Sequence, residues 1–554
     1  MPKKVARYVL PLLGLGALVL VRCVGDSATP TGDGGTDATT PTNDAGTQDG
    51  SAKDSAADAD AAPPPPPAPT PDGGVAWFDH FQNGAYAYSG ISSVTVDKDG
   101  AIIGVGAFTG AVDFGTTALT SNGGLDAVVV KTNPAGAVEW ATSMATSGTS
   151  LKDDGFWSVT TDSAGNIYVV GSSASSNYTL GSLPAGTGPA VFVAKLESSG
   201  TKWDWVHAYT GTVSVVDVAV HDTNVFVALD FSGTLDYGGG NSVTSAGGQD
   251  AFVGALSATD GSVVWGERLG GAGTDSVSDI DATPTGDVIV AGNFTSTSLG
   301  GNGVGTALPI SLVGTTQNGF VAKLEASDGK ATYAFPFGDS ASGGDTAANG
   351  VAYYNGLVAV GGYISGSQVS FGTGSAAGPY ATTAGWDGYV FVYDESKKQT
   401  TGATRLTSNQ GDFVTGVSFD AWGSIAVTGV YGTYNPNNGG SSTAGSTNAK
   451  LGSVPLTNTG VYAQGFIIAK LDPSGNNVVW VHGYVPNTPD GGVGNYSIDH
   501  WLYGARVTTD SNGRIFGSGA LGTTGVVIGS LGYIAKLSPD QAYYADGFVG
   551  AWLP

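Results

Sequence analysis

A four-strand repeat is the feature that most restricts how this chain can fold. Its best copy, Val159–Tyr209, reads VTTDSAGNIYVVGSS, a variable segment, and then VFVAKLESSGTKWDWVHAY. Apolar residues alternate with polar ones and the runs break at Asp, Ser and Gly, a pattern typical of short β-strands joined by tight turns. Copies of the first turn recur 59 to 90 residues apart, marked by Gly100, Gly165, Asn224, Gly286, Gly356, Gly423 and Gly513.

Each copy continues with a third strand, such as VFVAKL at Val191–Leu196, and with a fourth strand that often carries an aromatic residue. Four antiparallel strands repeated at this period predict an all-β fold, a seven-bladed β-propeller of four-stranded antiparallel blades. Seven blades are favoured over six or eight. We expect the fourth-strand aromatics to pack between blades: Trp140, Trp205, Trp265, Tyr333 and Trp480.

The two ends of the repeat array predict how the ring closes. The segment Ala76–Gly84 matches a fourth strand such as Val138–Ala145, and no first three strands precede it. We therefore expect an N-terminal strand to complete the last blade, which removes two open sheet edges. Both Gly532–Leu537 and Asp546–Leu553 match a third strand for that blade. The AKL ending favours Gly532–Leu537 and leaves the final residues as an extra strand or cap.

The repeat resembles the bacterial β-propeller family often called SBBP, whose units read like D-x-x-G-N-x-Y-V-x-G followed by D-A-F-V-A-K-L. DSAGN with IYVVGSS, and DAFVGAL at Asp250–Leu256, carry the resemblance. It extends from about Val75 to the C-terminus, and YYNGL at Tyr353–Leu357 is the poorest match. The resemblance implies the fold and leaves function open.

The N-terminal residues 1–22 have the pattern of a signal peptide. Lys3, Lys4 and Arg7 precede the apolar run Tyr8–Val21, which is short for a membrane span. Cys23, the only cysteine, follows directly, and this placement resembles the lipobox of bacterial lipoproteins, in which the cysteine is acylated. Leu20 fits that pattern, whereas Arg22 departs from it. The resemblance implies an exported lipoprotein at the outer membrane or cell surface; the alternatives are plain secretion or an uncleaved anchor.

Residues 23–74 form a stalk rich in Asp, Thr, Ala and Pro. They contain almost no large apolar side chain, so we expect them to be disordered, and the propeller to occupy residues 75–554. The net charge of the whole chain is −25. Such a charge argues against nucleic acid and against adsorption to anionic lipid, which leaves a lipid anchor as the expected membrane contact. We expect a monomer.

Two long loops supply the candidate ligand site. Thr433–Gly460 and Val485–Trp501 both belong to one blade and should project on the same face, opposite the tight turns. An insertion that touches nothing is the alternative. The candidate residues are Tyr434, Asn435, Asn437, Asn438, Tyr496, His500 and Trp501.

A second set of candidates consists of carboxylates placed eleven residues before the turn glycine of their blade, at the start of the innermost strand: Asp154, Asp275, Asp345 and Asp412. A ring of carboxylates could bind Ca²⁺, which takes six to eight oxygen ligands. The favoured interpretation is a latch, in which each Asp accepts backbone N–H bonds from its own loop. No other cofactor is indicated.

The sequence favours binding over catalysis. G-x-S-x-G, H-E-x-x-H and a cysteine–histidine pairing are all absent from it. Ala255–Trp265 is similar to the tryptophan-docking repeat of pyrroloquinoline quinone dehydrogenases, but it departs at Ser257 and Asp260, and packing suffices to explain it. The expectation is a scaffold for a protein or polysaccharide ligand outside the cell. The alternatives are a glycan hydrolase or lyase that uses paired carboxylates at the channel mouth, and an inert spacer.

Overall fold

The computed structural model describes residues 75–79, 88–115, 117–122, 124–147, 152–301, 310–314, 316–341, 343–382, 385–433, 448–456, 465–484, 502–521 and 546–554. Every regular element in this part of the chain is a β-strand. Within the same ranges no helix offers the length and apolarity of a membrane span. The lipidation candidate Cys23 and the residues predicted to form a signal peptide and a stalk lie outside the described residues.

The strands form four-stranded antiparallel units, and each unit is called a blade and is named by its innermost strand. The first blades in chain order are β2 (Tyr88–Val96) with β3 (Ile102–Thr109), β6 (Asp126–Thr132) and β7 (Val138–Ser143); β9 (Asp154–Thr161) with β10 (Ile167–Ser173), β13 (Ala190–Leu196) and β14 (Trp203–His221); and β14 with β15 (Asn224–Gly238), β16 (Asn241–Ser257) and β17 (Val263–Gly270). β14 is shared because it runs on from one blade's outer edge to the next blade's inner edge.

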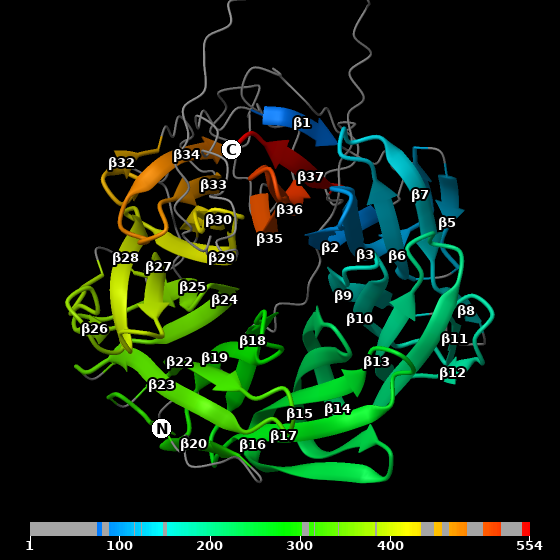
Figure 1. Ribbon diagram of the computed structural model, residues 1–554, viewed down its shortest axis with the longest axis horizontal. Helices are drawn as coiled ribbons and strands as arrows, with labels where there is room; N and C mark the ends of the chain where they lie inside the picture. Colours follow the sequence, from blue (N-terminus) through cyan, green and yellow to red (C-terminus); the bar gives the residue numbers. More distant parts are fainter. Residues whose placement is uncertain are drawn as a thin grey trace, which may run out of the picture.

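The next blades follow the same order. They are β18 (Asp275–Ala282), β19 (Val288–Phe294), β22 (Asn318–Leu324) and β23 (Ala331–Asp339); β24 (Thr346–Tyr354), β25 (Leu357–Ile364), β27 (Asp387–Asp394) and β28 (Gln399–Thr407); and β29 (Gly411–Phe419), β30 (Ile425–Thr433), β33 (Gly465–Leu471) and β34 (Val478–Tyr484). Figure 1 shows the blades set around one axis, with their innermost strands facing it, which is the arrangement of a β-propeller.

The β35 blade joins strands from opposite ends of the sequence. It runs β35 (Leu502–Thr509), β36 (Ile515–Leu521), β37 (Asp546–Trp552) and β1 (Val75–Asp79), and β1 pairs antiparallel with β37 from Val75↔Trp552 to Asp79↔Val549. The expectation that Gly532–Leu537 supplies the third strand is wrong, because β37 occupies that place. Residues 532–537 lie outside the described part of the chain.

A β-bulge interrupts the pairing of the two innermost strands at an equivalent place in each blade. In the β2 blade it leaves Ser92 unpaired, and in the β24 blade it leaves Asn349 unpaired. The second strand has a glycine opposite most of these bulges; a Cβ on Gly106 would lie 1.4 Å from the carbonyl oxygen of Gly90, and one on Gly362 would lie 1.9 Å from that of Ala347. The repeated glycine of the second strand is therefore required by the close backbone approach at the bulge.

The core lies between neighbouring blades. Tyr168 and Val193 of the β9 blade pack in one buried cluster with Val227 and Phe252 of the β14 blade. Short, alternating strands thus bury both of their faces against adjacent blades, which accounts for the near-continuous burial of third strands such as β13 and β22.

Trp205 and Trp265 dock onto the next blade, as predicted for fourth-strand aromatic residues. The indole Nε1 of Trp205 donates to the carbonyl oxygen of Ala258 at 3.3 Å, and that of Trp265 donates to Ala326 at 2.8 Å. A Cβ on Gly261, in the turn between strands three and four, would lie 2.7 Å from the Trp205 ring. The turn glycine and the tryptophan of the preceding blade therefore form one contact.

The loops between second and third strands reach the preceding blade. β11 (Asn177–Thr179) pairs with β8 (Ala145–Ser147), which follows the β2 blade directly. In the same way β20 (Ser298–Gly301) pairs with β17, β26 (Val369–Ser370) with β23, and β31 (Lys450–Leu451) with β28. The remaining short strands are β4 (Ala111–Phe114), β5 (Thr117–Thr120), β12 (Gly186–Thr187), β21 (Ile310–Ser311) and β32 (Val454–Pro455). The described parts of these loops therefore extend the outer edge of the neighbouring blade.

Candidate functional site

Several carboxylates near the axis of the ring accept hydrogen bonds from backbone N–H groups of the neighbouring blade. The innermost strand of each blade is an edge strand, so its inward N–H groups need partners outside their own sheet. Asp217 on β14 accepts a hydrogen bond from the Ile280 N–H at 3.0 Å. Asp279 on β18 accepts one from the Val351 N–H at 2.7 Å. Each of these aspartates follows the bulge of its own strand and ties it to the next blade.

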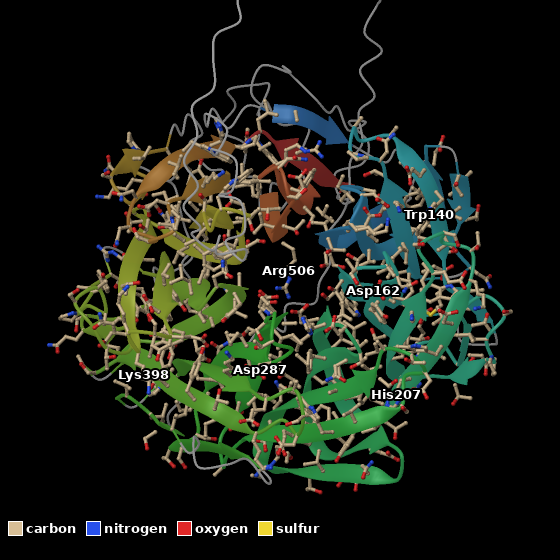
Figure 2. The ribbon with its side chains drawn as sticks, in the orientation of Figure 1. Trp140, Asp162, His207, Asp287, Lys398 and Arg506 are labelled. Atoms are coloured by element: carbon tan, nitrogen blue, oxygen red, sulfur yellow. The ribbon has the colours of Figure 1, made fainter. Side chains whose placement is uncertain are left out.

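Arg506 joins these carboxylates from the other side of the axis. It lies on β35, and Figure 2 shows its side chain at the centre of the ring. Its guanidinium forms a short ion pair with Asp279, and its Nη2 lies 3.7 Å from Asp217 Oδ1. The Ser158 hydroxyl donates to the same Asp217 oxygen. Four blades therefore contribute side chains to one polar cluster, defined here as the axial cluster of Ser158, Asp217, Asp279 and Arg506.

The charges of the axial cluster do not cancel, because one guanidinium faces two carboxylates. Burial raises the pKa of Asp279 well above its usual range, and Asp217 adds to this, while Arg506 and the Val351 N–H oppose it. Burial also acts to lower the pKa of Arg506, but the attraction of Asp279 and Asp217 outweighs it and holds the pKa above its ordinary value. Arg506 therefore stays charged, while burial and the nearby Asp217 carboxylate favour proton uptake by Asp279.

Asp281 lies two residues beyond Asp279 on the same strand and repeats its role. It accepts a hydrogen bond from the Tyr353 N–H at 2.7 Å. Burial raises the pKa of Asp281 to about 7, and this hydrogen bond only partly offsets the effect. A carboxyl that titrates near neutrality is a feature of many acid–base sites, although structural networks perturb pKa values too.

Asp230 takes a position that an asparagine fills in the next blade. Asn293 Oδ1 accepts the Ala348 N–H at 2.8 Å, and Asp230 Oδ1 accepts the equivalent Val277 N–H at 3.0 Å. Burial raises the pKa of Asp230 to about 8, partly offset by the Val277 N–H. A pKa of about 8 favours the neutral carboxyl near pH 7. The second oxygen, Oδ2, accepts a hydrogen bond from Gln249 Nε2 at 2.9 Å.

Two of the predicted channel-mouth carboxylates make several hydrogen bonds within their own loops. Asp154 starts β9 and accepts bonds from the Ser175 N–H at 3.3 Å and the Ser175 hydroxyl at 2.7 Å. Asp275 starts β18 and accepts the Gly271 N–H at 2.7 Å and the Ser296 hydroxyl at 2.5 Å. Both side chains are buried, and the bonds have the pattern expected of a latch.

The other two carboxylates are less completely bonded. Asp345 directly precedes β24, and the Gln317 N–H lies 3.4 Å from its Oδ1. Asp412 on β29 accepts the Ser408 hydroxyl at 2.8 Å and the Gly432 N–H at 3.0 Å, but its Oδ2 is buried without a hydrogen-bond partner. Burial raises the pKa of Asp412 to about 8. Within the described ranges no three His, Cys, Asp or Glu side chains gather closely enough to hold a metal ion.

The candidate ligand residues Tyr434, Asn435, Asn437, Asn438, Tyr496, His500 and Trp501 lie outside the described residues. They stay a prediction.

Sequence reasoning missed the axial cluster. A usable signal was present, because Asp217, Asp279 and Asp281 each place a charge inside the apolar alternation of an innermost strand. Arg506 could not be paired with them from sequence, since it lies 227 positions beyond Asp279. The repeat also hides a second pair. The lysine near the end of the third strand binds the aspartate of the first turn, Lys470 to Asp420 at 2.8 Å and Lys131 to Asp97 at 2.7 Å.

No protein-family model matches the chain, and no curated protein matches it. Solved structures do match. BamB from Moraxella catarrhalis is 10% identical, with 86% of this chain and 100% of that chain covered and a TM-score of 0.36. The Dos1 propeller is 9% identical, with coverage of 85% and 93% and a TM-score of 0.35. A quinohemoprotein alcohol dehydrogenase from Pseudomonas putida HK5 is 10% identical, with coverage of 84% and 75% and a TM-score of 0.33. These similarities concern the fold and carry no argument about function.

Proposed function

We propose that this chain is an exported β-propeller that acts as a binding scaffold for a protein or polysaccharide outside the cell. The observation that carries the proposal is the axial cluster. Asp217 and Asp279 are engaged by the backbone of the next blade and by Arg506, so the most concentrated carboxylates of the ring hold blades together. If the axial side chains hold the blades together, the loops of the ring are left as the place for a ligand site. Binding residues concentrate on loops that a rigid scaffold positions.

Binding to immobilised glycans and pull-down from extracellular material, both with the full chain, test this proposal. The sharpest comparison is between the full chain and a variant in which a short Gly-Ser linker replaces residues 434–447, with a second variant that alters the tight turn at Ser163 and Ala164 as the matched control. We expect the loop variant to lose at least tenfold in affinity and the turn variant to retain it. Absence of any ligand, or equal binding by both variants, would refute the proposal.

We also propose that the blades form a seven-bladed ring closed by β1. The repeated first turn and the antiparallel register between β1 and β37 support this arrangement. Deleting residues 75–79 should convert one cooperative thermal transition into a broader transition at lower temperature, because two sheet edges would be left open. An unchanged transition would contradict closure by β1.

We propose a tether in addition, on the basis of the export pattern and Cys23. Mass spectrometry of the native N-terminus tests it directly. A diacylglyceryl or acyl mass on Cys23 is expected, and an unmodified Cys23 or cleavage elsewhere would defeat the anchor.

One observation favours the alternative of a glycan hydrolase or lyase. Asp412 has an unpartnered Oδ2 and a pKa raised by burial to about 8, the state that a general acid requires near neutral pH. The alternative predicts a glycan-cleaving activity that Asp412→Asn abolishes while the thermal transition stays in place. Reducing-end assays on bacterial and plant polysaccharides would detect it.

A further inference from the structure

Trp480 breaks the docking pattern of the fourth-strand tryptophans. It stands opposite Lys470 in its blade, as Trp205 stands opposite Lys195, so its position in the blade is the same. Three of these tryptophans lie under a glycine in the turn of the next blade: a Cβ added to that glycine would lie 2.6 Å from the Trp140 ring and 2.7 Å from the rings of Trp205 and Trp265. Trp205 and Trp265 also donate an indole hydrogen bond to that turn. Among the described glycines, none has the Trp480 ring as a near neighbour of an added Cβ. Trp480 is also buried, with 9% of its surface exposed, but its Nε1 has no hydrogen-bond partner.

The exception follows from the make-up of the next blade. The β35 blade lies beside β34, because the Trp552 indole on β37 donates to the Tyr484 hydroxyl on β34 at 2.8 Å. In the other blades a turn of the chain links the third strand to the fourth. Here the third strand is β37 and the fourth is β1, from opposite ends of the sequence, so no continuous turn can cover Trp480.

The residues that lead into β1 have the sequence of such a turn. Pro71, Gly73, Val75 and Trp77 repeat the spacing of Pro134, Gly136, Val138 and Trp140. The strand registers agree with this alignment. Lys131↔Trp140 and Thr132↔Val138 in the β2 blade correspond to Ala551↔Trp77 and Trp552↔Val75 in the β35 blade. Gly73 therefore holds the position of a docking glycine, four residues before the fourth-strand tryptophan.

We propose that Pro71–Gly74 is the occupant of the Trp480 surface, and that it completes the split turn of the β35 blade. Gly73 then covers the Trp480 ring as Gly261 covers Trp205 and Gly329 covers Trp265, where an added Cβ would lie 2.7 Å from the ring. A main-chain carbonyl oxygen of the same segment accepts the Trp480 indole N–H. The last residues of the stalk thus belong to the propeller.

Hydrogen exchange of the unmodified full chain, followed by mass spectrometry, tests this. We expect the amides of Asp72–Gly74 to exchange at least about tenfold more slowly than those of Asp37–Gly50 in the same stalk. Equal exchange in the two stretches overturns the proposal, since a different segment or a partner would then be the occupant of the Trp480 surface.

Paired variants provide a second, independent measurement. Gly73→Val should lower the thermal midpoint by several degrees, on the order of 2–5 °C, because a branched side chain cannot lie over the indole. Gly50→Val, in the middle of the stalk, is the matched control and should cause no shift. In a Trp480→Ala background the effect of Gly73→Val should fall by at least about half, as coupling between contacting residues requires. An effect of the same size in both backgrounds overturns the contact.

Discussion

The blades are joined differently along the axis and at the rim. Along the axis the linking side chain changes from blade to blade: Ser92 donates to the Phe156 carbonyl oxygen, Asp217 accepts from Ile280, and Asn349 donates to Val414. At the rim one contact recurs, a tryptophan against the turn glycine of the next blade. The rim contact gains free energy mainly from apolar burial, whereas each axial contact mainly avoids an unpaired backbone group. The rim contact is therefore the same in three successive blades, whereas the axial contact uses a different side chain in each of the blades compared.

The largest effect should come from the rim. Trp265→Ala removes a buried indole from the cluster it shares with Phe320 and Leu324, and should lower the free energy of unfolding by about 3–5 kcal/mol. Trp265→Phe keeps an aromatic ring and loses the hydrogen bond to Ala326, so it should cost less. Chemical denaturation of both variants measures this. A loss below about 1 kcal/mol for the alanine variant would show that the rim contact does not stabilise the packing of neighbouring blades more than the axial contacts do.

Arg506→Met should have the next largest effect, and it should depend on pH. Removing the guanidinium leaves Asp217 and Asp279 facing each other, at a cost of about 3 kcal/mol near pH 8. The Asp279 carboxyl takes up a proton more readily without Arg506, so the loss should shrink as the pH falls toward 5. Lys398→Met, on an exposed turn, serves as the control for removing one positive charge. A loss that is equal at pH 5 and pH 8 would contradict the axial pairing.

Asp230→Asn should stabilise the protein in alkaline solution. The folded pKa of Asp230 is about 8, above that of an unfolded aspartate, so its contribution to stability is fully present below about pH 4 and is lost as the pH rises through 8. Asparagine keeps the acceptor for the Val277 N–H and cannot ionise, while the Gln249 amide can turn to face it. We expect a thermal midpoint higher by roughly 2 °C or more at pH 9, and a much smaller change at pH 4 or below, where both the folded and the unfolded carboxyl are protonated. A larger rise of the thermal midpoint in acid than at pH 9 would refute the raised pKa of Asp230.

Ser92→Ala should have the smallest effect of the four. It removes one hydrogen bond, 2.7 Å from the hydroxyl to the Phe156 carbonyl oxygen, and should cost about 1 kcal/mol. Denaturation curves for this variant and for Ser163→Ala, on a surface turn, give the comparison. A loss as large as that of Trp265→Ala would remove the distinction between axis and rim.

The sequence was informative where the repeat was regular. Alternating strands, turn glycines and fourth-strand tryptophans predicted an all-β propeller and its packing between blades, because these features obey local rules of turn and strand chemistry. The third strand of the β35 blade was misassigned, since GYIAKL at Gly532–Leu537 matches the motif better than DGFVGAW does, and motif quality carries no information about strand pairing.

The axial cluster was missed for a different reason. Asp217, Asp279 and Arg506 meet only after the ring has formed, and their spacing along the chain has no periodicity to detect. Asp154 and Asp275, which the regular spacing singles out, form their hydrogen bonds within their own loops. In a repeat protein, a carboxylate that recurs at regular spacing is first explained by a structural role. A single charged residue within an apolar strand, such as Asp217 or Asp279, is an equally useful signal when candidate sites are chosen from sequence.

The pairing of β1 with β37 has a mechanical consequence. In a tethered protein, any pull between a bound ligand and the anchor reaches the folded ring through β1 and the residues that lead into it. The hydrogen bonds between β1 and β37 run across the strands, so tension along β1 loads them together, whereas tension directed away from the sheet breaks them one at a time. The direction of the pull would therefore decide how long a ligand stays attached to an intact ring.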